Sequence, residues 1–314
     1  MTSATPLPRR GVFKAGLALS TAALIPAVAA PDASASATIP GPRGVDAGGL
    51  RGAEAALRDL ERRYGARLGV FARNVRSGRI VAHRAQERFA MCSTFKAFAA
   101  AAVLRDHRRC APLDKVIHYP ARDILPNSPV TEQHVDTGMT VGELCAAAIR
   151  YSDNAAGNLL LRQIGGPGGL TGFFRSIGDP VSRLDRWEPD LNAAVPGDPR
   201  DTTTPQAMGR SLRRLTLGRA LDDAGRRHLI TWLKGNTTSG ERFRAGLPDD
   251  WIVADKTGTG DYASAHDVGI AWTTRKTPIV LVVLSSKPAQ HAAVDNALIA
   301  DAARVLARAL APGE

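Results

Sequence analysis

The segment PIVLVVLS at residues 278–285 decides the fold. It is apolar at almost every position, which is typical of a central strand that is buried on both faces. Two more strand-like runs precede it, at residues 251–255 and 267–273, and the links between the three runs are too short to hold crossover helices. The end of the chain is therefore predicted to form an antiparallel sheet.

Helix and strand patterns upstream extend this picture. Apolar residues recur at helical spacing over residues 49–64, and strand-like runs follow at 68–72 and 80–82. A last helix is expected over residues 292–310. Between these ends the pattern predicts helices at 94–107, 141–150, 154–164, 168–177, 205–217 and 222–234, and Thr204 followed by Pro205 is a favourable helix start.

Strands at both ends with helices between them predict an α/β fold of the α+β type. It would be an antiparallel sheet flanked by helices, with an inserted all-helical domain. The sheet domain would be discontinuous, comprising residues 41–84 and 235–314, and the helical domain would cover residues 85–234. We expect the active site in the cleft between the two domains, a common place for ligand pockets.

Residues 1–40 are predicted to be an export signal and a flexible N-terminus. A basic segment at 9–14 precedes an apolar stretch at 15–30, which is too short, and too close to candidate cleavage sites, for a membrane span. The paired Arg9 and Arg10 are similar to a twin-arginine signal, and an ordinary secretory signal is the alternative. We expect a secreted protein, extracellular or periplasmic, with no stable membrane association after cleavage.

The net charge of the chain limits the binding partners that we expect. The formal net charge is +11, of which three come from Arg9, Arg10 and Lys14, and this leaves +8 for the rest of the chain. The remaining basic residues alternate with acids and form no aromatic-flanked stripe, so a solvated surface is predicted and nucleic acid is not expected as a partner. We also expect a monomer, because no apolar helix face stands out as an interface.

Cysteine and histidine content bears on disulfides and metals. Of the three cysteines, Cys110 and Cys145 could pair, but no structural disulfide is predicted, and Cys92 is expected to be a buried apolar side chain. The seven histidines include no H-x-H or H-x-x-x-H pair. No metal or other cofactor is therefore expected.

The first of four short motifs is Ser93-Thr94-Phe95-Lys96. Ser93 is expected to open a helix, and Lys96 lies one turn further on the same face, within reach of the hydroxyl. Free N–H groups and the dipole at a helix N-terminus favour developing negative charge there, and a serine needs such help to act as a nucleophile. The alternative is a serine N-cap beside a solvent-facing lysine.

Each of the other three motifs also has a plain structural alternative. Ser152-Asp153-Asn154 lies at a break between two predicted helices, where all three residues are good caps. Glu188-Pro189-Asp190-Leu191-Asn192 alone is a polar loop between helices. Lys256-Thr257-Gly258-Thr259 ends a predicted strand, where Gly258 would let a ligand approach the backbone; a glycine turn is the alternative.

Together and in this order, the four motifs resemble those of the class A serine β-lactamases, from about residue 49 to the C-terminus. The resemblance implies hydrolysis of the β-lactam ring of penicillins and cephalosporins through a serine acyl-enzyme, which gives antibiotic resistance. The partner would be a small-molecule β-lactam, and no cofactor is implied. Rival readings are a D-alanyl-D-alanine peptidase or penicillin-binding protein, and a non-hydrolytic penicillin-binding sensor. Glu188 with Asn192 favours the β-lactamase.

By this resemblance the catalytic residues are Ser93, Lys96, Ser152 and Glu188. Ser93 would attack the lactam carbonyl after Lys96, or Glu188 through a water, removes its proton; the motifs leave this choice open. Ser152 would relay a proton to the leaving nitrogen. Glu188 would then activate the water that hydrolyses the acyl-enzyme.

The resemblance also implies a set of substrate-binding residues: Asn154, Asn192, Lys256, Thr257, Gly258, Thr259 and Arg242. Asn154 would hold Lys96 and the substrate amide, and Asn192 would hold the hydrolytic water. The N–H groups of Ser93 and Thr259 would form an oxyanion hole. The substrate carboxylate would bind Lys256, the hydroxyls of Thr257 and Thr259, and Arg242, with Arg244 as the competing arginine.

Further expectations follow from the comparison with the family. Arg186 and Asp201 are expected to form an ion pair at the neck of the Glu188 loop, and the Glu188–Pro189 bond is a cis candidate. Asn127 stands where an aromatic residue often flanks the cleft. Gly260 stands where some members carry a cysteine that bridges to the position of Cys92, which argues against the bridged carbapenem-hydrolysing subgroup.

Overall fold

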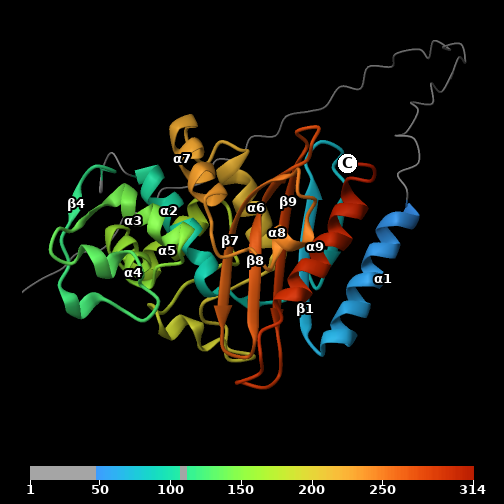
Figure 1. Ribbon diagram of the computed structural model, residues 1–314, viewed down its shortest axis with the longest axis horizontal. Helices are drawn as coiled ribbons and strands as arrows, with labels where there is room; N and C mark the ends of the chain where they lie inside the picture. Colours follow the sequence, from blue (N-terminus) through green and yellow to red (C-terminus); the bar gives the residue numbers. More distant parts are fainter. Residues whose placement is uncertain (1–46, 107–111) are drawn as a thin grey trace, which may run out of the picture. The chain divides into compact units, whose positions relative to one another are not determined.

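The structure, a computed structural model, describes residues 47–106 and 112–314 (Figure 1). Five antiparallel strands build its main sheet in the order β2-β1-β9-β8-β7. The strands are β1 (Arg67–Asn74), β2 (Ile80–His83), β7 (Ile252–Gly260), β8 (Ser264–Trp272) and β9 (Pro278–Ser286). The mixed helix and antiparallel-sheet fold is thus confirmed, and β9 is the central strand, as predicted. The division into two domains at the predicted boundaries stays a prediction.

The central strand β9 is apolar at nearly every position because both of its faces are buried. Its side chains alternate between two hydrophobic cores, one on each side of the sheet. One core takes Val280, Val282 and Leu284, and the other takes Ile279, Leu281 and Val283. This period of two is the alternation of a strand, and burial of both sets explains why the sequence shows no polar face.

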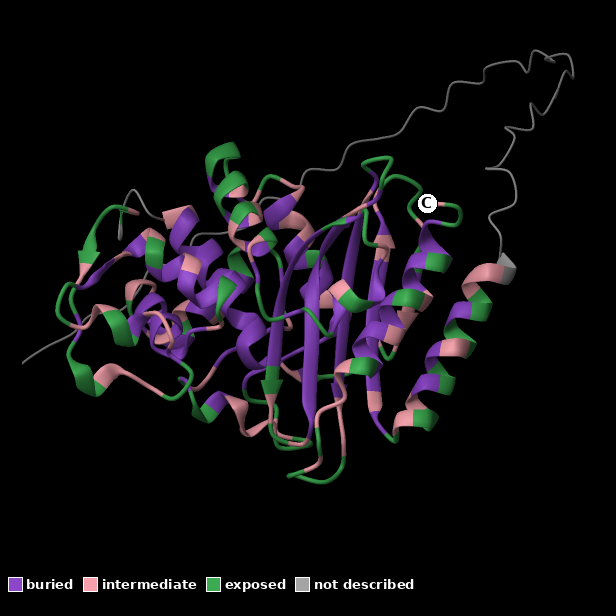
Figure 2. Ribbon diagram, in the orientation of Figure 1, coloured by how far each residue is buried: buried purple, intermediate pink, exposed green. Residues whose placement is uncertain are grey.

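Three helices cover one face of the sheet. They are α1 (Ala47–Tyr64), α8 (Phe243–Gly246) and α9 (Asn296–Leu310), and their apolar residues belong to one core with that face (Figure 2). Helix α9 begins four residues later than the predicted start at 292. Asp295 forms an ion pair with Lys287, and the Asn296 side chain accepts from Arg242, so tertiary contacts occupy the residues at this helix start.

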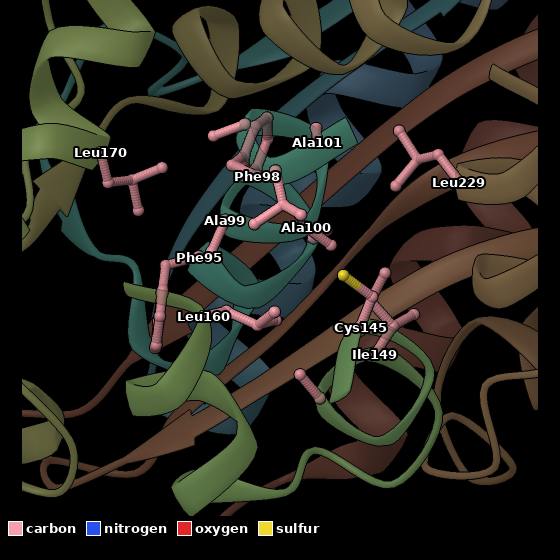
Figure 3. Close-up of a cluster of buried hydrophobic side chains, with 14 of the residues drawn as sticks. Phe95, Phe98, Ala99, Ala100, Ala101, Cys145, Ile149, Leu160, Leu170 and Leu229 are labelled. Atoms are coloured by element: carbon pink, nitrogen blue, oxygen red, sulfur yellow. The ribbon is translucent and has the colours of Figure 1, made fainter. Parts of the chain in front are cut away.

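The other face of the sheet packs against α6 (Pro205–Thr216) and the remaining helices. These are α2 (Phe95–Asp106), α3 (Val141–Arg150), α4 (Asn154–Gln163), α5 (Gly166–Ser176) and α7 (Asp223–Lys234). Figure 3 shows part of their core, and Phe98, Cys145, Ile149, Leu160 and Leu170 are among the side chains labelled there. Helix α2 is buried on all sides from Phe95 to Leu104, so the lysine that it carries has a fixed environment.

Short elements link these layers. Strand β3 (Phe89–Ala90) pairs with β6 (Thr202–Thr203), and β4 (Val116–Ile117) pairs with β5 (Met139–Thr140). Within residues 47–106 and 112–314 the 3₁₀ turns are η1 (Cys92–Thr94), η2 (Ala121–Asp123), η3 (Thr131–His134) and η4 (Asp190–Ala193). Helix α6 begins as predicted, since the Thr204 hydroxyl accepts from the N–H of Ala207 and Pro205 is its first residue.

Some predictions concern residues outside the described ranges. The export signal at 1–40, His107 at the predicted end of one helix, and Cys110 lie there. Cys92 and Cys145 are buried free thiols. Within the described ranges, no helix combines the length and the apolar character needed to cross a membrane.

Candidate active site

Ser93 and Lys96 lie in contact where η1 leads into α2. The Lys96 Nζ atom donates to the Ser93 Oγ atom over 2.9 Å, and both side chains are less than a tenth exposed. Ser93 sits in the 3₁₀ turn η1, and α2 begins two residues later at Phe95. The predicted serine–lysine contact is therefore present, whereas the solvent-facing lysine of the alternative reading is wrong.

Groups from two other segments surround the Lys96 amine. It donates to Asn154 Oδ1 over 2.6 Å and to the Ser152 carbonyl over 2.7 Å, and it lies 3.0 Å from Glu188 Oε1. Burial lowers the pKa of Lys96, and the carboxylate of Glu188 opposes this effect without cancelling it. The fully buried amine is thus held among oxygen atoms, with its neutral form favoured relative to that of a solvated lysine.

The predicted loop motif brings Glu188 to the same serine. Glu188 Oε1 accepts from Ser93 Oγ over 3.2 Å, and Glu188 Oε2 accepts from the Asn192 side-chain amide. The Asn192 Oδ1 atom is buried and has no hydrogen-bond partner among the described residues. One carboxylate therefore contacts the serine with one oxygen and Asn192 with the other.

The neck of this loop is closed as predicted. Arg186 Nε donates to Asp201 Oδ2 over 2.5 Å, and Asp201 Oδ1 accepts from the N–H groups of Asp185 and Arg186. The Glu188–Pro189 peptide bond is cis. The fully buried Asp201 carboxylate joins the two ends of the loop by a charged side chain and two backbone donors.

Sequence reasoning missed Asn158 on α4. Its Oδ1 atom accepts from the N–H of Glu188 over 3.0 Å, and its Nδ2 atom donates to the Glu188 carbonyl over 3.0 Å. This side chain therefore fixes both sides of the Glu188 backbone. A signal for it was present, because Asn158 follows Asn154 by four residues and so shares its helix face.

The Ser152-Asp153-Asn154 motif forms the tight turn before α4. Ser152 has a left-handed backbone with φ 58°, a conformation that costs a non-glycine residue on the order of 1–3 kcal/mol and that clusters at functional sites. Asp153 is fully buried and caps α4 by accepting from the N–H of Ala156. It also accepts from the N–H groups of Val130 and Thr131. Asp153 thus holds the turn, and Ser152 and Asn154 project toward the two lysines.

Strand β7 carries the fourth motif inside the strand. The predicted strand ends at residue 255, but β7 runs through Gly260 because Lys256 to Gly260 continue to pair with β8. Lys256 Nζ donates to Ser152 Oγ over 3.1 Å. Burial and then the charge of Lys96 hold the pKa of Lys256 well below its usual range.

Gly258 allows two parts of the backbone to pack closely, whereas the sequence predicted that a ligand would approach the backbone here. A Cβ atom at this position would lie 3.1 Å from the Met91 carbonyl oxygen and 3.2 Å from the Thr94 nitrogen. The missing side chain therefore lets β7 lie against η1, whereas the sequence suggested room for a ligand. The consequence for the site is that Thr259, the next residue of β7, lies near the turn that carries Ser93.

The two candidate arginines have different partners. Arg242 Nη2 donates to the Thr259 hydroxyl over 2.8 Å, and Arg242 Nη1 donates to the carbonyls of Gly258 and His266. Arg244 instead forms an ion pair with the fully buried Asp255. Arg242 therefore belongs to the Lys256–Thr259 surface, and the charge of Arg244 is neutralised elsewhere.

All eleven predicted site residues thus lie at the junction of η1, the α3–α4 turn, the Glu188 loop, and β7 with its Arg242 neighbour. Asn127 also reaches this junction, since its side-chain amide donates to the Ser152 carbonyl over 3.1 Å. In the described part of the chain, no group of three or more histidine, cysteine, aspartate or glutamate side chains is placed to hold a metal ion.

Comparison with known proteins identifies this arrangement. The model of the beta-lactamase enzyme family matches residues 52–310. Beta-lactamase AST-1 of Nocardia asteroides is 55% identical over 259 residues, which are 82% of this chain and 84% of that protein. The solved β-lactamase of Streptomyces albus G has a TM-score of 0.81 and 53% identity, and the match covers 82% of this chain and 99% of that chain.

A second solved structure specifies the class. It is the class A β-lactamase of the last common ancestor of Gram-negative bacteria, with a TM-score of 0.79 and 51% identity over 82% of this chain and 98% of that chain. Both the sequence match and the structural match therefore extend over most of the described residues. The chain belongs to the beta-lactamase enzyme family, and within it to the class A serine enzymes that hydrolyse the β-lactam ring.

Proposed function

We propose that Ser93 is the nucleophile and that Lys96 takes its proton during acylation. The single observation that carries this proposal is the 2.9 Å contact between Lys96 Nζ and Ser93 Oγ. An amine whose pKa is lowered by burial is a better proton acceptor at neutral pH than a solvated lysine. Asn154 and the Ser152 carbonyl would keep the amine directed at the serine.

Glu188 is proposed as the general base of deacylation. Its Oε2 atom accepts from Asn192, whose own Oδ1 has no partner among the described residues and is available to a water molecule. A water held between these two side chains would lose a proton to Glu188 as it attacks the acyl-enzyme. General-base assistance of this kind contributes about 10²–10⁴ in rate.

The remaining site residues are proposed to handle the leaving nitrogen, the oxyanion and the substrate carboxylate. Ser152 Oγ contacts Lys256 Nζ, so it can pass a proton to the lactam nitrogen. The N–H groups of Ser93 and Thr259 would stabilise the oxyanion, and one such donor is worth about 10²–10³ in rate. Lys256, Thr257, Thr259 and Arg242 would bind the carboxylate.

Penicillins and cephalosporins are the proposed substrates, and the activity confers resistance to them. The Thr259 hydroxyl at the anion-binding end supports the inclusion of cephalosporins. Gly260 leaves Cys92 without a bridging partner at that position, which argues against the bridged carbapenem-hydrolysing subgroup.

The test is benzylpenicillin hydrolysis by the purified mature protein, with the intact protein mass recorded at intervals. Fast turnover with little adduct is the expected result, and the Ser93→Ala variant should show neither turnover nor adduct. A persistent one-to-one adduct without turnover would instead indicate a penicillin-binding peptidase or a sensor. Retained turnover in Ser93→Ala would overturn the assignment of the nucleophile.

Export and a monomeric state are further proposals. The support for export is the sequence pattern at residues 9–30, with the Arg9-Arg10 pair favouring the twin-arginine route over the general secretory route. Replacing both arginines by lysine should leave the enzyme inside the cell, whereas the general route would tolerate this change. Light scattering of the mature protein should give the mass of one chain, and a dimer mass would contradict the monomer.

A further inference from the structure

We propose that a cavity beside α6 binds a small multiply charged phosphate anion. The cavity has a volume of about 530 Å³. Its basic lining residues are Arg88, Arg210 and Arg214, and residues 178–181 after α5 form the opposite wall. A neighbouring cavity of about 170 Å³ shares Arg210 and Arg214 and adds Arg73 and Arg213.

Two of these arginines are fixed in place by hydrogen bonds to neighbouring residues. Arg214 Nη1 donates to the carbonyls of Ile177 and Gly178 over 2.6 and 2.7 Å. Arg88 Nη1 donates to the Val181 carbonyl and to the Thr202 hydroxyl. In each case the bonds to described residues use Nη1 alone, so the Nη2 donors stay free while the guanidinium is held. A fixed fork of unused donors suits bidentate binding of phosphate oxygens.

Three more arginines around the two cavities carry charge without a counter-ion. The side chains of Arg73, Arg210 and Arg213 form no hydrogen bond or ion pair with any described residue. The Nε atom of Arg73 is moreover buried without a partner. A buried donor of this kind loses its hydration on folding, and an anion would restore a hydrogen bond to it.

The one carboxylate in the lining does not oppose an anion strongly. Asp179 is almost fully buried, and its oxygens accept from the N–H groups of Val181 and Ser182 and from the hydroxyls of Ser182 and Ser211. Its charge is thus already solvated by four donors. The N-terminal end of α6, at Thr204 to Ala207, faces the same cavity and adds the positive end of a twelve-residue helix dipole.

These features specify the ligand class. Five guanidinium groups around two adjoining cavities favour an anion with several charges and tetrahedral oxygens over a monovalent carboxylate. The cavity volumes fit a free oligophosphate of a few phosphoryl units. Inorganic triphosphate is therefore the probe, and vesicles of phosphatidylglycerol represent the same phosphate chemistry presented by a lipid surface.

The test is calorimetric titration of the mature enzyme with sodium triphosphate at constant ionic strength. We expect saturable binding of one triphosphate per chain, and Arg210→Gln should weaken it by about tenfold or more, since a charged hydrogen bond is removed. Arg227→Gln on α7 is the matched control, because Arg227 is exposed like Arg210 and its replacement removes the same charge. The triphosphate affinity of Arg227→Gln should stay within about twofold of that of the unaltered protein.

Both variants should hydrolyse penicillin at the unaltered rate, which shows that they are folded. Arg88→Gln provides a second variant from the other wall and should also weaken triphosphate binding. Equal losses of triphosphate affinity in Arg210→Gln and Arg227→Gln would show that binding depends on net charge alone. This result would overturn the proposed site. Absence of triphosphate binding would overturn it too, and so would binding to phosphatidylglycerol vesicles alone.

Discussion

Gly260 lies directly against the thiol of Cys92: a Cβ atom at position 260 would come within 2.8 Å of Cys92 Sγ. In a disulfide these two atoms are separated by only two bonds, so a cysteine at 260 meets the distance requirement for a bridge. The same Cβ would lie 2.7 Å from the Asn192 carbonyl oxygen. Position 260 is therefore coupled both to the free thiol and to the loop that carries Glu188.

We predict that Gly260→Cys forms a disulfide with Cys92 under oxidising conditions. The oxidised variant should unfold at higher temperature than its reduced form, with a gain of about 2–4 kcal/mol. Gly260→Ser adds a side chain of similar size that has no thiol. This variant therefore measures the effect of displacing the Asn192 carbonyl in the absence of a disulfide. Thiol titration and thermal unfolding check the bridge, and two free thiols at these positions in the oxidised variant would contradict it.

Glu188→Ala should separate acylation from deacylation. If Lys96 suffices to activate Ser93, this variant still reacts with benzylpenicillin but releases the product about 10²–10⁴ times more slowly. Intact-mass measurement after rapid mixing would show accumulation of the acyl-enzyme. Unchanged steady-state hydrolysis would show that Glu188 is not the deacylation base, and loss of acylation would assign the first proton transfer to Glu188.

Asn158→Ala should loosen the Glu188 loop from α4. The change removes two hydrogen bonds to the Glu188 backbone and leaves that N–H and carbonyl unpaired, which should lower the free energy of unfolding by about 1–3 kcal/mol. Deacylation should slow more than acylation, because the carboxylate loses its position. Pre-steady-state kinetics check this, with Gln163→Ala near the end of the same helix as the control.

Arg242→Ala should affect mainly substrate binding, and Arg244→Ala should affect mainly stability. Arg242→Ala should raise the KM for benzylpenicillin, because its guanidinium contacts Thr259 and carries a charge that no described carboxylate neutralises at close range. Arg244→Ala leaves the buried Asp255 without its ion-pair partner, so it should lower stability by about 3–5 kcal/mol. Steady-state kinetics and urea unfolding distinguish the two, and an unchanged KM in Arg242→Ala would contradict its role in binding.

The pH dependence of stability should report on Asp267. Burial, and then the neighbouring Asp255 carboxylate, raises its pKa well above 3.8. The folded protein therefore keeps this proton to higher pH than the unfolded chain does. The resulting stabilisation is complete below about pH 3.8 and is lost as the pH rises toward the folded-state pKa, with a slope of up to about 1.4 kcal/mol per pH unit.

Asp267→Asn is the matched variant for this effect. An asparagine can still accept from the N–H of Phe243 and donate to Asp255, but it cannot ionise. Urea unfolding between pH 4 and 8 should therefore show a shallower decline in the variant than in the unaltered enzyme. Identical profiles would show that another group governs the pH dependence.

The sheet could be predicted because its signal is local. The apolar run of β9 requires burial on both faces, and the short links to β8 and β7 allow only antiparallel pairing. The site residues were predicted from their motifs, which hold each set of side chains within one turn or loop. The order of the strands and the approach of β7 to η1 come from pairing between distant segments.

What the sequence did not reveal depends on such distant contacts. Whether Lys96 faces solvent or the core is decided by helices packed around α2, and a local pattern does not contain them. The role of Asn158 was not predicted, because its partner, the Glu188 backbone, is thirty residues away in the sequence. The continuation of β7 through Gly260 likewise follows from its register with β8, and the residue types of the motif do not require it.

The environment of Lys96 has a consequence for the folding of the enzyme. The amine contacts groups at positions 93, 152, 154 and 188, so a reactive serine exists only after segments nearly a hundred residues apart have met. Such non-local contacts are among the slower events of folding. Acylation by a fluorescent penicillin would therefore count only chains that have reached the native state, and labelling at intervals during refolding would time the completion of the tertiary structure.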